Sequence, residues 1–337
     1  MKKFTQLALA SSVVLSANAM AMQALDDASL SATTGQDGIS IGIGISKIEI
    51  EKLFIHDTDG YTSPTGATAP PSLNSAGFGG TTTAGSIVIY GDGKDNSATK
   101  NHGIVIGANY DNNGAYLLPT RNLADLTIDS DAGDGNPFIN IAAAVSGLDI
   151  NIGKIGVQAT AEAPATTADS IRRGGTGTVN DILSGLSLKT GPLSANIQLG
   201  AAPQGAMIKL NAEMIGGLEI LNLGILDNST AGATIAPGVT TDGPGEIFVE
   251  SIKLTDANSR NLKLNQSVSV FGESAANKGF VRIVSTSGAH DAYVKGVHLG
   301  SRGAASIGDV EVQGLQTYYS PAQGTYNPGA IITIKGH

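Results

Sequence analysis

The chain lacks cysteine and tryptophan, and only 4% of its 337 residues are aromatic. Without cysteine it has no disulfide framework, no cysteine-ligated zinc or iron–sulfur site and no thiol nucleophile. Charged residues are also scarce, at 15%, and the balance of 20 basic against 29 acidic residues is wrong for a protein that neutralises nucleic-acid phosphates. These absences exclude several classes of cofactor protein and nucleic-acid binder.

Glycine and aliphatic residues are abundant instead. There are 45 glycines, and 41% of the residues are hydrophobic, which is enough to build a folded core. At roughly 150 residues per domain, a chain of this length is expected to form two domains, although all-β chains of 200–250 residues often form a single domain.

Residues 1–21 have the three parts of a secretory signal peptide. A basic start at Lys2 and Lys3 precedes the apolar run Leu7–Leu15, and two A-x-A sites follow, ending at Ala19 and Ala21. We expect cleavage after Ala21, with Ala19 as the alternative site; a buried helix is the competing interpretation. Removal of the two lysines changes the formal charge from −9 to −11. The sequence therefore predicts export to the cell surface, the extracellular medium or the periplasm.

No later segment approaches 18 uninterrupted apolar residues, so we expect no transmembrane segment. The region 39–337 instead predicts an all-β body. Ile39, Ile41, Ile43 and Ile45 alternate with small residues, which is the period of a half-buried strand. Comparable runs are Ser86–Tyr90, Gly103–Ile106, Leu123–Ile128, Leu148–Val157, Ala206–Leu210, Glu246–Leu254, Asn261–Val270, Phe280–Val284 and Ala330–Ile334.

A second pattern interrupts this alternation. Apolar residues at offsets 0, 3, 5 and 8 begin at Ile45, Ile215 and Ile307, and looser copies begin at Val145, Ile152, Leu183, Val249 and Val294. A step of three reverses the face of a strand, so each copy predicts a bulge or a corner between two short strands. The copies at 152, 183, 215 and 249 lie 31, 32 and 34 residues apart, a spacing found in stacked repeats.

Two architectures can use such bent strands. We favour an elongated β-solenoid or β-roll with a corner at each reversal; the alternative is an elongated antiparallel β-sandwich with bulges. Residues near 57–85, 161–180 and 228–245 are rich in turn-forming residues and predict long loops.

Motifs for enzymatic chemistry are absent. None of the five histidines lies in an H-x-x-x-H or H-E-x-x-H arrangement, and no G-x-S-x-G turn supplies a nucleophile. Asp129, Asp131 and Asp134 form an acidic stretch that is a candidate for Ca²⁺, although it fails the EF-hand pattern and a solvated turn is the ordinary explanation. We therefore predict no enzyme and no cofactor other than Ca²⁺ at that stretch.

The segment 22–38 predicts one short helix, with Asp26 and Asp27 in its first turn and Gly35 after its end. Its sequence, MQALDDASLSATTGQDGI, resembles the start of secreted DUF6160-type proteins of Gram-negative bacteria, including FilA-like proteins of a pilus system. The resemblance covers about residues 1–45 and implies a component of a surface filament. The resemblance implies no catalytic residues.

We thus expect an exported structural component of a surface filament, whose partners are other subunits, assembly proteins or its own copies. The short apolar strand carrying Ile331, Ile332 and Ile334 could augment a neighbouring sheet edge, or pair within its own fold. The alternative function is a secreted or periplasmic adhesin-like module that binds glycan or matrix through its long loops. A third hypothesis is a polysaccharide-degrading enzyme that uses Asp129 and Asp131.

Overall fold

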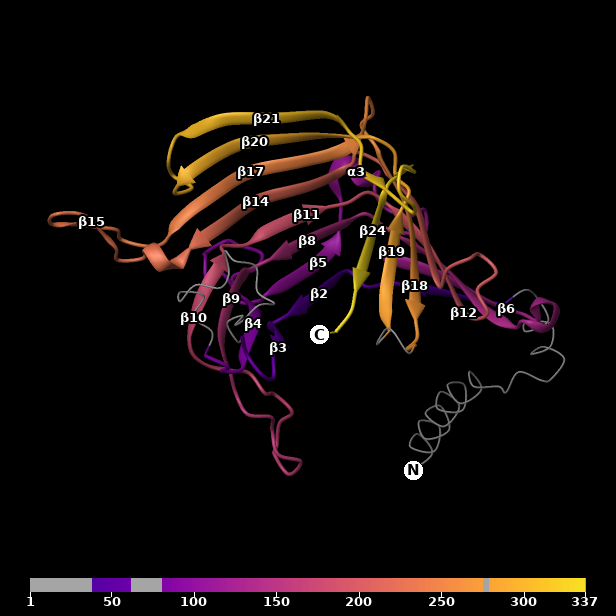
Figure 1. The fold of residues 1–337 in the computed structure, drawn as a ribbon, viewed down its shortest axis with the longest axis horizontal. Coiled ribbons are helices and arrows are strands. Elements are labelled where there is room, and N and C mark those ends of the chain that lie inside the picture. Colours follow the sequence, from indigo (N-terminus) through magenta and orange to yellow (C-terminus); the bar gives the residue numbers. More distant parts are fainter. Residues whose placement is uncertain (1–37, 62–80, 275–278, 337) are drawn as a thin grey trace, which may run out of the picture.

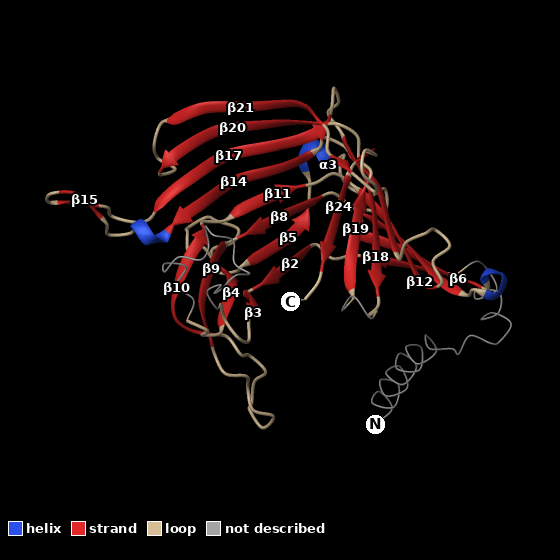
Figure 2. Cartoon of the chain, in the orientation of Figure 1, coloured by secondary structure: helices blue, strands red, loops and turns tan. Residues whose placement is uncertain are grey.

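The computed structural model describes residues 38–61, 81–274 and 279–336, and it confirms the all-β prediction. In this described part of the chain, Figure 2 shows long strands with short helical turns between them. These turns are α3 (Asp111–Gly114), η3 (Gly133–Gly135) and η4 (Asn228–Thr230). No helix in the described ranges is long and apolar enough to cross a membrane. The expected signal peptide, both cleavage sites and nearly all of the segment 22–38 lie outside the described residues.

Two large sheets make up the body (Figure 1). The first sheet has eight strands in the order β1 (Ile39–Ile43), β6 (Ala124–Asp131), β7 (Phe138–Val145), β12 (Leu193–Gly200), β13 (Ile208–Met214), β18 (Leu262–Phe271), β19 (Phe280–Ser285) and β24 (Ala330–Ile334).

The second sheet has twelve strands. Eight of them follow in the order β2 (Lys47–Ile50), β5 (Ile104–Ala108), β8 (Leu148–Ile152), β11 (Leu186–Lys189), β14 (Leu218–Asp227), β17 (Gly245–Asp256), β20 (His290–Gly300) and β21 (Ser306–Leu315). The other four, which continue the sheet beyond β14, are β10 (Gly175–Leu183), β9 (Lys154–Thr160), β4 (Gly85–Tyr90) and β3 (Lys52–His56). Two small hairpins complete the fold: β15 (Thr234–Ala236) with β16 (Val239–Thr240), and β22 (Tyr318–Tyr319) with β23 (Asn327–Pro328).

The chain runs from one sheet into the other eight times, and we call each such pair of connected strands a crossing. β1 leads into β2, β7 into β8 and β13 into β14, and the other crossings join β5 with β6, β11 with β12, β17 with β18, β19 with β20, and β21 with β24. The order of these crossings is the same in both sheets, so the body is one meander of eight bent strands. The sheets meet at the shared bend and diverge from it (Figure 1).

Every pairing among the described strands is antiparallel. The sandwich-like alternative therefore describes the body, whereas a solenoid would stack parallel coils. The spacing of 31–34 residues therefore does not come from the stacked repeats of a solenoid. The copies at 152, 183, 215 and 249 fall on consecutive bent strands of the meander.

The predicted phase reversals coincide with bends and bulges. Gly216 and Gly217, both at positive φ, separate β13 from β14, and Ser146 and Gly147 separate β7 from β8. The copy at Ile307 falls on β21, where the register with β20 shifts. Between the aliphatic faces of the two sheets the step is three residues at the β7–β8 bend, from Val145 to Leu148, and four at the β13–β14 bend, from Met214 to Leu218.

Several of the best-buried apolar side chains lie near these bends, although Val88, 1% exposed, lies within β4. Met214 ends β13 and is paired with Leu262, which begins β18 and is 1% exposed. At the β7–β8 bend the fully buried Ser146 hydroxyl donates to the carbonyl of Asn122 (2.7 Å) and accepts from the backbone N–H of Leu118 (3.0 Å). The loop between β5 and β6 is thereby held against the bend.

The three predicted long loops differ in outcome. Residues 62–80 of the first lie outside the described part of the chain. The second is shorter than expected, because β10 begins at Gly175, and the third contains η4 and the β15–β16 hairpin.

Substitution of Gly217 tests the bend. An alanine there would need positive φ (+79°), and its Cβ would lie 2.6 Å from the Leu254 carbonyl oxygen. We expect Gly217→Ala to lower the free energy of unfolding by about 3 kcal/mol or more. The control is Gly232→Ala, which has the same positive φ (+71°) with open space around the new atom, so that about 1 kcal/mol is expected. Thermal unfolding followed by circular dichroism measures both, and equal losses would contradict the role of the bend.

Candidate interaction surface

One face of the first sheet carries a continuous row of aliphatic side chains. Residues directly opposite one another in antiparallel strands point to the same face, so the register defines rows across a sheet. The first row, one residue from each of the eight strands, is Ile39, Ile128, Ile141, Ile197, Ile208, Val268, Ile283 and Ile332. We call it the first aliphatic row.

The second sheet repeats this arrangement. Its second aliphatic row is Ile48, Ile106, Ile150, Leu188, Ile220, Ile252, Val294 and Val310. The neighbouring row projects to the opposite face and is mostly charged: Lys47, Gly107, Asp149, Lys189, Glu219, Lys253, Tyr293 and Glu311. Basic and acidic side chains alternate along this charged row, which suits cross-strand pairing.

Both aliphatic rows are half-buried in the middle of the sheets and open at their ends. Ile39 and Ile332, which end the first row, are 62% and 55% exposed, and Val310, at one end of the second row, is 51% exposed. An inner strand shields its side chains with a neighbour on each side, whereas an edge strand has a neighbour on one side. The rows therefore end in exposed apolar side chains.

The ends of the rows lie on unpaired sheet edges. Within the described residues, β1 pairs only with β6, and β24 pairs only with β19. In the second sheet β2 pairs only with β5, and β21 only with β20. Each edge presents unpaired N–H and C=O groups, which are a template for another strand.

The strand predicted as a subunit contact is one of these edges. β24 pairs within the chain along one side, and its other side is unpaired in the described structure. Ile332 and Ile334 project to the aliphatic face and Ile331 to the opposite face, as the alternation requires.

The candidate Ca²⁺ residues are only partly brought together. Asp129 and Asp131 share a face of β6, and the Asp131 carboxylate accepts a hydrogen bond from the backbone N–H of Gly133 (2.5 Å). Asp134 lies in η3. No group of three His, Asp or Glu side chains that could hold a metal ion occurs among the residues that the structure describes.

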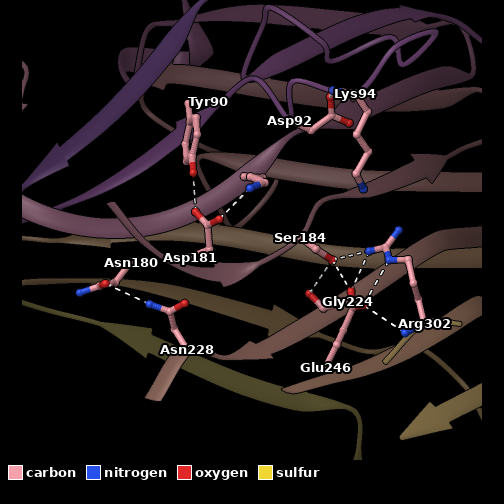
Figure 3. Close-up of polar contacts among 11 residues, drawn as sticks. Tyr90, Asp92, Lys94, Asn180, Asp181, Ser184, Gly224, Asn228, Glu246 and Arg302 are labelled. Atoms are coloured by element: carbon pink, nitrogen blue, oxygen red, sulfur yellow. Dashed lines mark hydrogen bonds and ion pairs between the residues drawn. The ribbon is translucent and has the colours of Figure 1, made fainter. Parts of the chain in front are cut away.

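A buried carboxylate that the sequence analysis missed holds the turn before β21 (Figure 3). Glu246 on β17 is 8% exposed, and its Oε1 accepts hydrogen bonds from Arg302 Nη2 and Ser184 Oγ, both at 2.7 Å. Arg302 also covers the Phe248 ring, 4.7 Å from its centroid. A side chain on Gly224 would collide with the hydrogen-bonded Ser184 Oγ and Glu246 Oε1 and displace them. Glu246, Arg302 and Ser184 come from distant segments of the chain, so no local sequence motif indicates that they lie together.

The electrostatics of this cluster favour the ionised carboxyl. Burial by itself would raise the pKa of Glu246, but the hydrogen bonds from Arg302 and Ser184 and the Arg302 charge bring that pKa below its usual value. A second cluster lies nearby in Figure 3: Asp181 accepts hydrogen bonds from Tyr90 and from Lys154 Nζ (2.8 Å). Burial, and then the Asp181 carboxylate, raise the pKa of Tyr90, which stays protonated.

A groove of about 980 Å³ lies between β3, β4 and the residues before β10. Its walls include Phe54, Tyr90 and two basic residues, Arg172 and Arg173. Arg172 contacts Glu51 at 3.1 Å, and Arg173 Nε donates to the Ala161 carbonyl (2.7 Å). The predicted loop 161–180 thus supplies one wall of the groove.

Comparison with known proteins supports one part of the sequence interpretation. Residues 1–114, about a third of the chain, match DUF6160, a family of unknown function, which confirms the DUF6160 part of the resemblance. Neither the curated proteins nor the solved structures gave a match.

Removal of Arg302 tests the cluster. Arg302→Ala leaves the buried Glu246 carboxylate without its cation, and we expect a loss of about 1–3 kcal/mol in unfolding free energy. The control is Lys100→Ala, because Lys100 pairs with the exposed Asp95 and should cost under about 0.5 kcal/mol. Urea unfolding at neutral pH measures both, and a similar small loss in each would contradict a structural role for Glu246.

The same carboxyl predicts a pH dependence. Its pKa is lowered in the fold, so its contribution is present above the unfolded pKa and is lost as pH falls through the folded value. We expect Glu246→Gln to flatten the decline of unfolding free energy in the acidic range. Urea titrations of both proteins across that range test this; an unchanged slope would be the contrary result.

Proposed function

We propose that this chain is an exported structural component of a bacterial surface filament, acting through contacts between subunits. The observation that carries the proposal is the state of the sheet edges: two aliphatic rows run to edge strands whose outer sides are unpaired in the described structure. The resemblance of the N-terminal segment to pilus-system proteins points the same way.

The composition of the two edges of the first sheet supports association. Soluble proteins usually protect an edge strand with lysine, proline or inward-pointing charge. β1 reads ISIGI and β24 reads AIITI, and neither contains a charged residue or proline. Full burial of an exposed isoleucine is worth roughly 1.5–3 kcal/mol, so covering these partly exposed side chains with another strand contributes part of that free energy in addition to the new backbone hydrogen bonds.

A second candidate function rests on the groove. An open, partly apolar groove with Arg172 and Arg173 on one wall suits an anionic glycan, which agrees with the alternative of a secreted or periplasmic adhesin-like binding module. Arginine binds carboxylate and sulfate groups through a planar set of N–H donors. This function uses the loops and leaves the sheet edges without a role.

The filament function is tested on cells. Immunogold electron microscopy of sheared surface material should place this chain along filaments, and deletion of its gene should remove the label and shorten or abolish the filaments. A strain carrying the gene back on a plasmid is the control. Label found only as dispersed soluble protein would contradict the proposal.

The groove is tested with heparin as an anionic probe. If the groove binds glycan, Arg172→Ala should weaken heparin binding in surface plasmon resonance by about tenfold, the loss of one charge-assisted contact. Arg260→Ala, which removes an arginine that does not line the groove, is the matched control. Equal binding by both variants would exclude the groove as the glycan site.

A further inference from the structure

The direction of the edge strands is compatible with an open, repeating assembly. The eight crossings alternate in direction, so the first crossing, β1–β2, runs antiparallel to the eighth, β21–β24. If a second copy is placed beside the first in the same orientation, its first crossing meets the eighth crossing of its neighbour in antiparallel fashion. Such a contact joins different surfaces and does not close by itself.

We propose that copies of this chain associate head to tail, with β24 of one copy pairing with β1 of the next and β21 pairing with β2. This inference rests on the proposed filament function and names the partner of its edges: a second copy of the chain. Both sheets then continue without a break from one copy to the next.

The register of the first sheet supports this partner. Continuing the first aliphatic row places Ile332 of one copy opposite Ile39 of the next, and Ala330 opposite Ile41. The two strands are equally long, at five residues each, and both are uncharged. The contact therefore covers the two exposed ends of the first aliphatic row with one another.

The second sheet adds charge complementarity. When Val310 is set opposite Ile48 of the next copy, Glu311 comes opposite Lys47 and the alternation of the charged row continues. The same register sets Asp309 opposite Glu49. Each of these carboxylates already has partners in its own copy: Asp309 accepts from Tyr293 Oη (2.7 Å) and Gly296 N (2.9 Å), and Glu49 lies 2.6 Å from Lys47 Nζ.

A two-fold dimer uses the edges less well. A two-fold axis that pairs β24 with its own copy passes through that edge, and it cannot also bring the two β21 edges together, because they lie in the other sheet. A two-fold pairing of β21 centred on Val310 would place Glu311 opposite the partner's Asp309. Head-to-tail association alone pairs both edges at once.

The absence of cysteine allows a direct cross-linking test on the full chain. Directly opposite residues in antiparallel strands have Cα atoms about 4.5–5.5 Å apart, within the range for a disulfide. Purified Ile39→Cys/Ile332→Cys protein should form a ladder of multimers on oxidation that disappears on reduction. Ser40→Cys/Ile331→Cys tests the same register from the other face of the sheet and should form the same ladder. It keeps the test valid if the first pair of substitutions disturbs the fold.

The matched control is Ile41→Cys/Ile334→Cys, on the same strands and face but four residues out of register, or roughly 13–14 Å apart. We expect little ladder from it. A ladder of equal strength from the control, no ladder from either in-register pair, or dimers from Ile332→Cys alone would each overturn the proposal. Filament labelling on cells without any ladder would retain the filament function and point to a different partner.

Charge reversal tests the second pair of edges. In the Ile39→Cys/Ile332→Cys background, Lys47→Glu and Glu311→Lys should each reduce cross-linking by about two- to fivefold, the range for one exposed ion pair. In a mixture, each contact between the two different variants pairs opposite charges, and cross-linking should recover through these contacts. If cross-linking does not recover in the mixture, β21 does not pair with β2, and the part of the proposal that concerns the second sheet is overturned.

Discussion

The register between antiparallel strands is the constraint on which this structure depends. Because side chains alternate with a period of two, a slip of one residue would move every isoleucine of a row to the polar face. Seven successive pairings keep the first aliphatic row in line from Ile39 to Ile332, and seven more keep the second from Ile48 to Val310. The same register aligns Lys189 with Glu219, so apolar and charged rows reinforce one alignment.

The bend is the second constraint, and it follows from the first. A strand that turns into another sheet carries its aliphatic residues across the bend, by a step of three from Val145 to Leu148 and of four from Met214 to Leu218. Gly217 turns at positive φ with the Leu254 carbonyl close by, a place that no larger residue fits. Leu262 and Met214 are buried beside this bend, and Val88 and Phe248 are buried on β4 and β17, whereas Ile39 and Ile332 on the edge strands are mostly exposed. The edges are consequently the parts of the fold with the most to gain from a partner.

The Glu246 cluster connects the interior to an edge. Arg302 lies in the turn between β20 and β21, and Ser184 lies at the bend between β10 and β11. By joining both to a buried carboxylate on β17, the cluster holds the start of β21 in place. If β21 contacts a second copy, the same ion pair positions the strand that makes the contact.

The sequence by itself determined the strand class, most strand positions and the sites of phase reversal, because alternation and offset-three steps are local properties of the chain. It also singled out Ile331, Ile332 and Ile334 as an apolar terminal strand. It did not determine the direction of pairing, since parallel and antiparallel neighbours use the same alternation. Only the tertiary structure decided that consecutive repeats lie side by side as a meander, that Glu246 meets Arg302 across 56 residues, and that both aliphatic rows end on open edges. Those outcomes depend on contacts between distant segments, which no local pattern encodes.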